Sequence, residues 1–522
     1  MTAVPRLRLP NELLHMVCSL ASQSDLPSLA LVDKTCNEIC TPLLYRTINL
    51  YEYDTAQKCV RTLAADPSTL FLKRNLASLV RTFLLHSSCH EALPGQPLPT
   101  FDTLFIESVS RMSNIQTLRC MEARDCSIHI WAQLLLKPRP ALRSIELLLI
   151  MSSNSPRTAR MEQLFRQILS RRFPVPRLSE LKLHVPLELT PSMIAIFRAV
   201  ITCCAATLRS LTVTTLKRAL FQLIVPPLST LPALQYLEIQ AQALQIPEFG
   251  HLSTVQSLCV RQTMWRMRDD FVVPPTHWPA LRELSCFPDL VSAFLPPEAE
   301  TQRPICALRL SDAAYKHNGG DYSPDMTPYW RDNLDAVSYT TYSTMPLLHF
   351  AFQANKLNIK RFAKLLPYIP SIESIVLILT SSPKPADVLA LGEAVVARLP
   401  RLHTLLLSDA AYKYGGQNHA FRFARDLALQ RRWLAAFAAC SSRLRHVAFT
   451  TEFEWERGAD GAWYPTELPR DRPVDFVESD ADDSDDSLDP DEEDDEGSIG
   501  SIEDHGVDFE EEGEGEAPVD GN

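Results

Sequence analysis

The sequence of 522 residues lacks any apolar run long enough to cross a membrane. Its apolar stretches are short, such as residues 147–151 and 375–379, whereas a membrane-spanning helix needs about 18 or more apolar residues. The first residues also lack the order of basic, apolar and small residues that marks a signal peptide. We therefore expect no membrane partner and a location in the cytoplasm, the nucleus or both.

The 13 cysteines include no C-x-x-C pair and no other spacing typical of a zinc site. Scattered cysteines of this kind are typical of free thiols in a reducing compartment. The chain also lacks a G-x-G-x-x-G motif, a P-loop and a G-x-S-x-G motif, so no set of nucleophile, base and orienting residue can be assembled. We nominate no catalytic residue, metal ligand or cofactor, and we expect the protein not to be an enzyme.

Basic residues are absent from the C-terminal end of the chain. Residues 475–522 hold 23 acidic residues and no lysine or arginine, whereas residues 1–474 hold all 51 basic and 40 acidic residues, a net charge of +11. The end of the chain has too little apolar content to offset chain entropy, so residues 471–522 are predicted to form a disordered acidic tail. Such a tail solubilises a chain or binds basic proteins such as histones.

The remainder of the chain is dominated by a repeated apolar phrase, L-x-x-L-x-L, in which other apolar residues replace some leucines. Its last three positions alternate with the period of a strand that is buried on one face. Thirteen copies occur, and their first residues are Val80, Ile115, Leu142, Leu178, Leu208, Leu234, Val255, Leu281, Ile305, Leu347, Ile372, Leu402 and Leu444.

Amphipathic helices are predicted between some of these phrases. They cover residues 158–172, a segment opened by Thr190 and Pro191, and residues 421–440. The second is expected to bury Ile194, Phe197, Val200 and Ile201, and the third Phe423, Leu427, Leu434 and Phe437. One strand and one helix or loop per repeat predict an α/β fold, a divergent leucine-rich-repeat-like solenoid over residues 51–470. An ordinary α/β domain with a parallel sheet is the alternative.

Three short helices are predicted within residues 1–50. Pro10 opens the first, Ser24 and Asp25 can cap the second, and the third is expected over residues 34–40, before Pro42. Leu13, Val17 and Leu20 form an apolar stripe on the first helix. So few residues cannot close a core of their own, which indicates that this unit is one half of an interface.

The N-terminal segment resembles the F-box motif in its fungal form. The resemblance rests on L-P-x-E-L-L from Leu9, D-L-x-x-L-A-L-V from Asp25 and P-L-L-Y-R-x-I-x-L from Pro42. It implies binding to the Skp-family adaptor of an SCF-type ubiquitin ligase, and through the adaptor to a cullin. The residues it places at that contact are Leu9, Pro10, Leu13, Leu14, Leu26, Leu29 and Val32. A helical hairpin that caps the solenoid is the alternative.

Two loops share a sequence that stands out from the repeats. S-D-A-A-Y-K occurs at residues 311–316 and again at 408–413, each time directly after a strand phrase and shortly before two glycines. The same place in two repeats indicates either a shared turn or a pair of binding loops on one rim of the solenoid. In the second case the candidate target-binding residues are Asp312, Tyr315, Lys316, Asp409, Tyr412 and Lys413.

Taken together, these features predict a subunit that recruits a protein target to a ubiquitin ligase, with the F-box on the adaptor and the solenoid on the target. We expect it to be monomeric within that complex and to bind no nucleic acid. The alternative is a scaffold or a binder of basic proteins that acts through the acidic tail and the solenoid, independently of any ligase.

Overall fold

The computed structural model describes residues 9–23, 25–65, 75–86, 99–120, 130, 134, 139–148, 163, 166, 177–185, 189–215, 218–246, 249–251, 253–261, 271–297, 302–310, 330–354, 356–379, 381–409 and 423–468. The chain divides into two units, residues 1–480 and 481–522, and all described residues belong to the first.

A single sheet of 16 strands runs through this first unit, and its strands are paired in the order of the chain. Strands β1 to β14 pair in parallel, and β15 and β16 follow as an antiparallel hairpin. The strands are β1 Thr47–Leu50, β2 Thr82–Leu85, β3 Thr117–Cys120, β4 Ser144–Leu148, β5 Glu180–His184, β6 Ser210–Thr214, β7 Tyr236–Gln240, β8 Ser257–Arg261, β9 Glu283–Cys286, β10 Ala307–Leu310, β11 His349–Ala354, β12 Ser374–Leu379, β13 Thr404–Asp409, β14 His446–Ala448, β15 Phe453–Arg457 and β16 Trp463–Glu467. In a doubly wound sheet the spatial order of the strands reverses at a switch point. Here the spatial order follows the chain throughout, which is consistent with a solenoid-like repeat.

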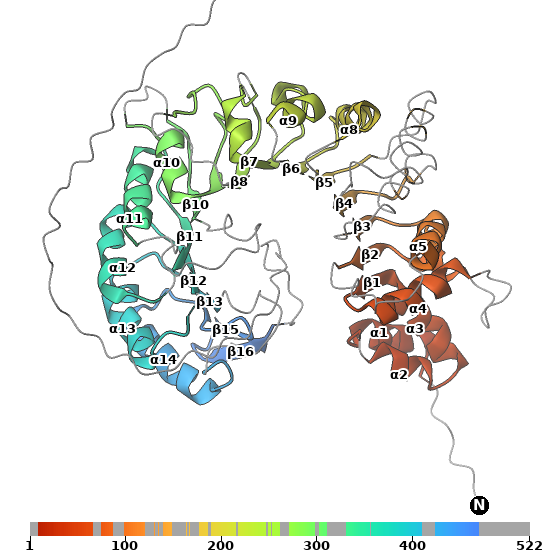
Figure 1. Cartoon of the computed structure of the whole chain (residues 1–522). Coiled ribbons are helices and arrows are strands. Elements are labelled where there is room, and N and C mark those ends of the chain that lie inside the picture. The colour runs from red at the N-terminus through yellow and green to blue at the C-terminus, as the bar shows by residue number, and fades with distance from the viewer. Residues whose placement is uncertain are drawn as a thin grey trace, which may run out of the picture. The chain divides into compact units, whose positions relative to one another are not determined.

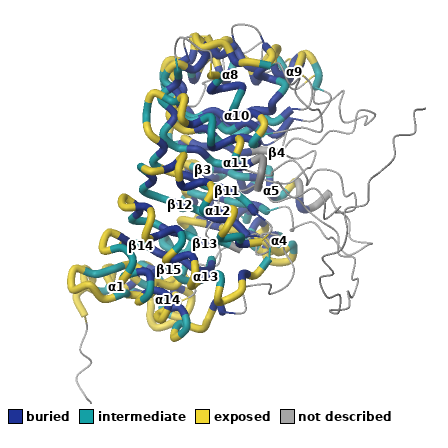
Figure 2. The backbone as a smooth tube through the Cα atoms, turned by 90° about the vertical axis from the view of Figure 1, so that its left-hand side faces the viewer, coloured by how far each residue is buried: buried dark blue, intermediate teal, exposed yellow. Residues whose placement is uncertain are grey.

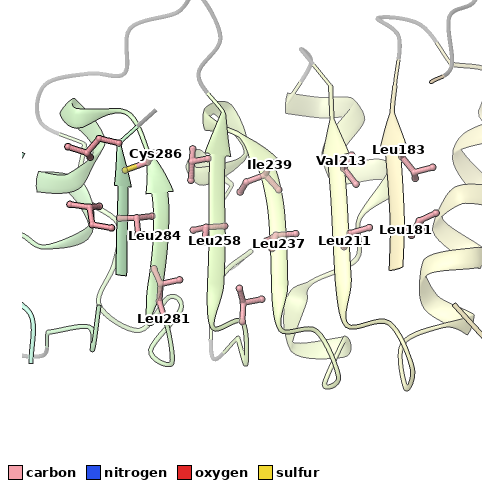
Figure 3. Packing of buried hydrophobic residues seen from close by; sticks show 14 of the residues in the cluster. Leu181, Leu183, Leu211, Val213, Leu237, Ile239, Leu258, Leu281, Leu284 and Cys286 are labelled. Carbon is pink, nitrogen blue, oxygen red and sulfur yellow. The ribbon is translucent and has the colours of Figure 1, made fainter. Parts of the chain in front are cut away.

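The thirteen apolar phrases correspond one to one to strands β2 to β14. Their leucines stand in register from strand to strand, as in Leu181, Leu211 and Leu237 of β5, β6 and β7. Figure 3 shows that these side chains, and Leu183, Val213 and Ile239 one step further along, project from the same face of the sheet. This face carries the main core, because each repeat buries its apolar residues against the next one.

Helices line one side of the sheet (Figure 1). Their buried apolar residues belong to the same core as the strand leucines. The α-helices are α1 Asn11–Leu20, α2 Leu26–Ala30, α3 Lys34–Arg46, α4 Tyr53–Ala64, α5 Pro99–Arg111, α8 Pro191–Cys203, α9 Arg218–Ile224, α10 Pro288–Phe294, α11 Trp330–Ser338, α12 Ile359–Leu365, α13 Pro385–Ala394 and α14 Leu427–Cys440. The 3-10 helices are η2 Leu76–Leu79, η4 Leu228–Thr230, η5 Ala241–Gln245, η8 Tyr339–Tyr342, η9 Leu366–Tyr368 and η10 Val396–Arg398.

Helix α8 begins where the sequence predicts. The hydroxyl of Thr190 accepts a hydrogen bond from the backbone N–H of Met193, and Pro191 occupies the first turn. Phe197, Val200 and Ile201 are buried as predicted, together with Met193 and Ile196, whereas Ile194 is half-buried. Of the helix predicted over residues 158–172, only residues 163 and 166 are described.

Helix α14 is shorter than predicted at its N-terminal end. The carboxylate of Asp426 accepts a hydrogen bond from the backbone N–H of Leu429 and caps the helix, which therefore begins at Leu427. Leu434 and Phe437 are buried on the helix, and Phe423 is buried ahead of it. The hairpin of β15 and β16, which the sequence did not predict, extends the sheet beyond β14. Its Trp455 donates an indole N–H hydrogen bond to the side-chain oxygen of Gln430 in α14 at 2.7 Å.

One expectation about the first fifty residues is wrong. The third helix does not stop before Pro42 but continues to Arg46. Pro42 cannot donate to the carbonyl of Glu38, yet Glu38 is exposed, and the packing of Leu43 and Leu44 into the helical core stabilises the continued helix. The sheet also begins inside this segment, because β1 pairs with β2 in register.

Candidate docking surfaces

The three N-terminal helices share a small core of their own. Cys18 of α1, Leu26 and Ala30 of α2 and Cys40 of α3 form its centre. The half-buried side chains packed against them are Leu14, Ala21, Leu29, Ile39, Leu43 and Leu44. Helix α3 leads directly into β1, so this small core is joined to the first strand of the sheet.

A stripe of large apolar side chains lies on the outer side of α1. Leu13, Met16, Val17 and Leu20 follow one another at helical spacing and are exposed, Leu20 to 82%. Figure 2 shows much of α1 in the colour of exposed residues. Two more apolar side chains, Leu31 and Val32, are exposed to 85% and 68% directly after α2. A soluble surface seldom exposes so many large apolar side chains in one short segment unless it binds a partner.

The structure divides the residues that the F-box resemblance nominates into two groups. Leu9, Pro10, Leu13 and Val32 are exposed. Leu14 and Leu29 are half-buried, and Leu26 is exposed to only 3%, so these three belong to the small core. Four exposed apolar residues of this segment are not among the nominated ones, namely Met16, Val17, Leu20 and Leu31. Met16 follows Leu13 by three residues and so falls on the same helix face. The adaptor-binding role of the seven residues stays a prediction.

Two buried thiols meet between α1 and α3. The Sγ atoms of Cys18 and Cys40 lie 3.4 Å apart, and both residues are buried. Burial, and next the contact with Cys18, raises the pKa of the Cys40 thiol to about 11. Both are therefore packing residues of the small core rather than reactive nucleophiles.

The face of the sheet opposite the main core carries charged side chains in its centre. Arg119 of β3, Glu146 of β4 and Lys182 of β5 stand in register. Glu146 is buried, and its carboxylate lies 3.1 Å from Arg119 Nε and 3.6 Å from both Lys182 Nζ and His184 Nε2. Burial alone would raise the pKa of Glu146, but the His184 ring and the charges of Lys182 and Arg119 outweigh it and lower that pKa to about 2.

A second carboxylate on this face is paired in the same way. Glu238 of β7 is buried and accepts hydrogen bonds from Arg261 Nε, from the hydroxyl of Thr212 at 3.1 Å and from that of Tyr236 at 3.1 Å. Burial, and next the charge of Glu238, raises the pKa of Tyr236. The buried carboxylates on this face are therefore paired with basic or hydroxyl side chains of the protein itself.

The paired S-D-A-A-Y-K loops fall almost wholly outside the described residues. Asp312, Tyr315, Lys316, Tyr412 and Lys413 are not described. Asp409 is the last residue of β13, where it pairs with Leu379 of β12. Their role in binding a target stays a prediction.

Among the residues in the described ranges, no three His, Cys, Asp or Glu side chains are arranged to hold a metal ion. No described helix is both long and apolar enough to span a membrane.

The comparisons with known proteins give no family. No family model matches the sequence, and no curated protein matches it significantly. Among solved structures, the search matched this chain to one in the crystal structure of the Rad7 and Elc1 complex in yeast, with 12% identity and a TM-score of 0.32 over 84% of this chain and 87% of the other. That TM-score is too low to establish a shared fold.

Proposed function

We propose that this chain is the target-recruiting subunit of an SCF-type ubiquitin ligase, working in the cytoplasm or nucleus. The N-terminal helices dock on the Skp-family adaptor and so on a cullin, and the sheet and its edges recruit a protein target. The chain itself performs no catalysis, because ubiquitin transfer belongs to other subunits. Holding target and ligase on one scaffold makes their encounter effectively intramolecular.

The observation that carries this proposal is the exposed stripe of α1, together with Leu31 and Val32. These side chains add little to the small core, whose centre is formed by other residues. Burying a stripe of this kind stabilises a complex by about 25 cal/mol for each Å² of apolar surface removed from water. The stripe also coincides with the segment that resembles the F-box motif.

The test measures adaptor binding by calorimetry with the full chain and a purified Skp-family adaptor. Leu13→Asp and Leu31→Asp each place an unpaired charge in the proposed interface, and should weaken binding by at least about a hundredfold. Leu389→Asp is the matched control, because Leu389 of α13 is similarly exposed but lies outside the N-terminal helices.

Thermal unfolding followed by circular dichroism verifies that all three variants stay folded, as expected for substitutions of exposed residues. Adaptor affinity that is the same in both test variants and the control would exclude docking through these helices. Binding to histones with no binding to the adaptor would favour the scaffold instead.

A further inference from the structure

One position recurs at the edge of the sheet where the parallel strands begin. It is the residue directly before each strand, and its backbone links the strands to one another. The carbonyl of Arg81 accepts from the N–H groups of Gln116 and Thr117 at 2.7 and 3.0 Å, and the carbonyl of Gln116 accepts from Arg143 at 2.8 Å. The same pattern continues to Arg445 before β14, although the positions before β10, β11 and β12 hold Cys306, Leu348 and Glu373 instead of a basic or amide residue. These residues therefore form a fixed row, one per strand.

We call the nine positions before β1 to β9 the amino-edge row. Its members carry hydrogen-bond donors and no carboxylate, and all but Ser179 are exposed. They are Arg46, Arg81, Gln116, Arg143, Ser179, Arg209, Gln235, Gln256 and Arg282. Five arginines and three glutamines at equivalent places give this edge a positive charge and a line of amide groups.

Most of the row's arginines are available to a partner. In the described part of the chain, the side chains of Arg46, Arg81, Arg209 and Arg282 make no hydrogen bond and no ion pair. Arg143 donates to the backbone carbonyls of Pro140 and Leu142, at 2.7 and 3.1 Å.

Two arginines near the C-terminal end of the sheet differ in this respect. Arg425 pairs with Glu452 at 2.9 Å, and the guanidinium of Arg431 lies over the ring of Trp455. Among the described residues, other exposed arginines such as Arg398 and Arg432 are also unpaired, but those of the amino-edge row stand in line along one edge of the sheet.

The dimensions of the row match an extended polypeptide. Neighbouring strands lie about 4.8 Å apart, so Arg81, Arg143 and Arg209, which precede β2, β4 and β6, are spaced by about 10 Å. An extended chain advances about 3.3 Å per residue, so every third residue of a peptide would meet an arginine. The glutamines of the row can pair with backbone groups of the same peptide.

We propose that the amino-edge row binds an extended acidic polypeptide segment of the recruited target. Calling the occupant a target rests on the proposed function, whereas binding of the segment does not. Single-stranded nucleic acid is the less suitable polyanion, because proteins that hold it stack its bases on aromatic side chains, and the row has none. Carboxylates at every third residue would meet the arginines of the row, among which Arg81 and Arg209 are free to form ion pairs.

The test uses the full chain without adaptor and a fluorescent peptide of about twelve residues with glutamate at every third position. Fluorescence anisotropy at low salt gives its Kd, which should rise about fivefold in Arg81→Gln/Arg209→Gln, because exposed ion pairs are individually weak. The difference should shrink as salt rises. A peptide with glutamine in place of glutamate should bind no more tightly to the full chain than to the variant.

The matched control is Arg218→Gln/Arg361→Gln, which removes from α9 and α12 two exposed arginines that have no side-chain partner among the described residues. Equal affinities in the two double variants would overturn the proposal, and so would tighter, row-dependent binding of single-stranded DNA. Peptide binding that occurs only after removal of residues 475–522 would assign the row to the chain's own acidic segment and overturn the assignment to a target. Adaptor binding is unaffected by any of these outcomes, so the two proposals fail separately.

Discussion

The buried carboxylate of Glu146 offers a quantitative test of the ion pairs on the face of the sheet opposite the main core. Glu146 is flanked on the neighbouring strands by Arg119 and by Lys182 and His184, all within 3.6 Å of its oxygens. Glu146→Gln keeps the shape of the side chain but removes the charge that these groups surround. The pKa of Glu146 falls from an ordinary value of 4.5 to about 2 in the folded protein.

That shift corresponds to a free energy on the order of 3 kcal/mol, since each pKa unit is worth about 1.4 kcal/mol. Because the folded state lowers this pKa, the stabilisation is fully present above about pH 4.5 and is lost as the pH falls toward 2. At pH 7 we therefore expect Glu146→Gln to lower the free energy of unfolding by about 2–3 kcal/mol. The difference from the wild type should narrow steadily below pH 4.5.

Urea denaturation at a series of pH values, followed by far-ultraviolet circular dichroism, measures this difference. Glu393→Gln is the control, because Glu393 of α13 is exposed, and its replacement should change stability by no more than about 0.5 kcal/mol. A Glu146→Gln variant as stable as the control at pH 7, or a deficit that persists unchanged at pH 2.5, would refute the role of the carboxylate.

Two further predictions concern groups buried elsewhere. Arg303 is buried and donates hydrogen bonds to the backbone carbonyls of Val273, Pro274, His277 and Phe294. Arg303→Met should therefore lower the free energy of unfolding by about 3–5 kcal/mol, as measured by urea denaturation. The control Arg361→Met, on the exposed side of α12, should change it by less than about 0.5 kcal/mol. Burial, and next the hydrogen bond with Cys18, raises the pKa of the Cys40 thiol to about 11. Iodoacetamide at pH 7.5 should therefore modify exposed Cys203 long before Cys40, as measured by mass spectrometry of the peptides. Equal rates of modification would contradict the buried contact.

Local periodicity determined much of this fold. The thirteen phrases located β2 to β14, because a strand buried on one face must alternate apolar and polar residues whatever its neighbours are. The cap at Thr190 located α8 for an equally local reason, a side chain that accepts from a nearby backbone N–H. The three N-terminal helices were also readable, each to within a few residues except at Pro42.

Contacts between distant residues decided the rest. The continuation of α3 through Pro42 and the membership of Thr47–Leu50 in the sheet depend on the packing of α3 and on pairing with β2. Which apolar residues of α1 face outward was equally undetermined, because Leu13 and Leu14 look alike until α2 and α3 cover only one side of the helix.

The amino-edge row shows the same division. Apart from Arg46, which belongs to no phrase, its arginines and glutamines stand at the second position of their phrases, so the sequence by itself determined their place within each repeat. The repeats differ in length, from 21 residues between Leu234 and Val255 to 42 between Ile305 and Leu347, so no fixed period aligns them in the sequence. Only the hydrogen bonds between adjacent strands made these residues neighbours, because pairing sets their spacing by the distance between strands and not by the length of chain between them.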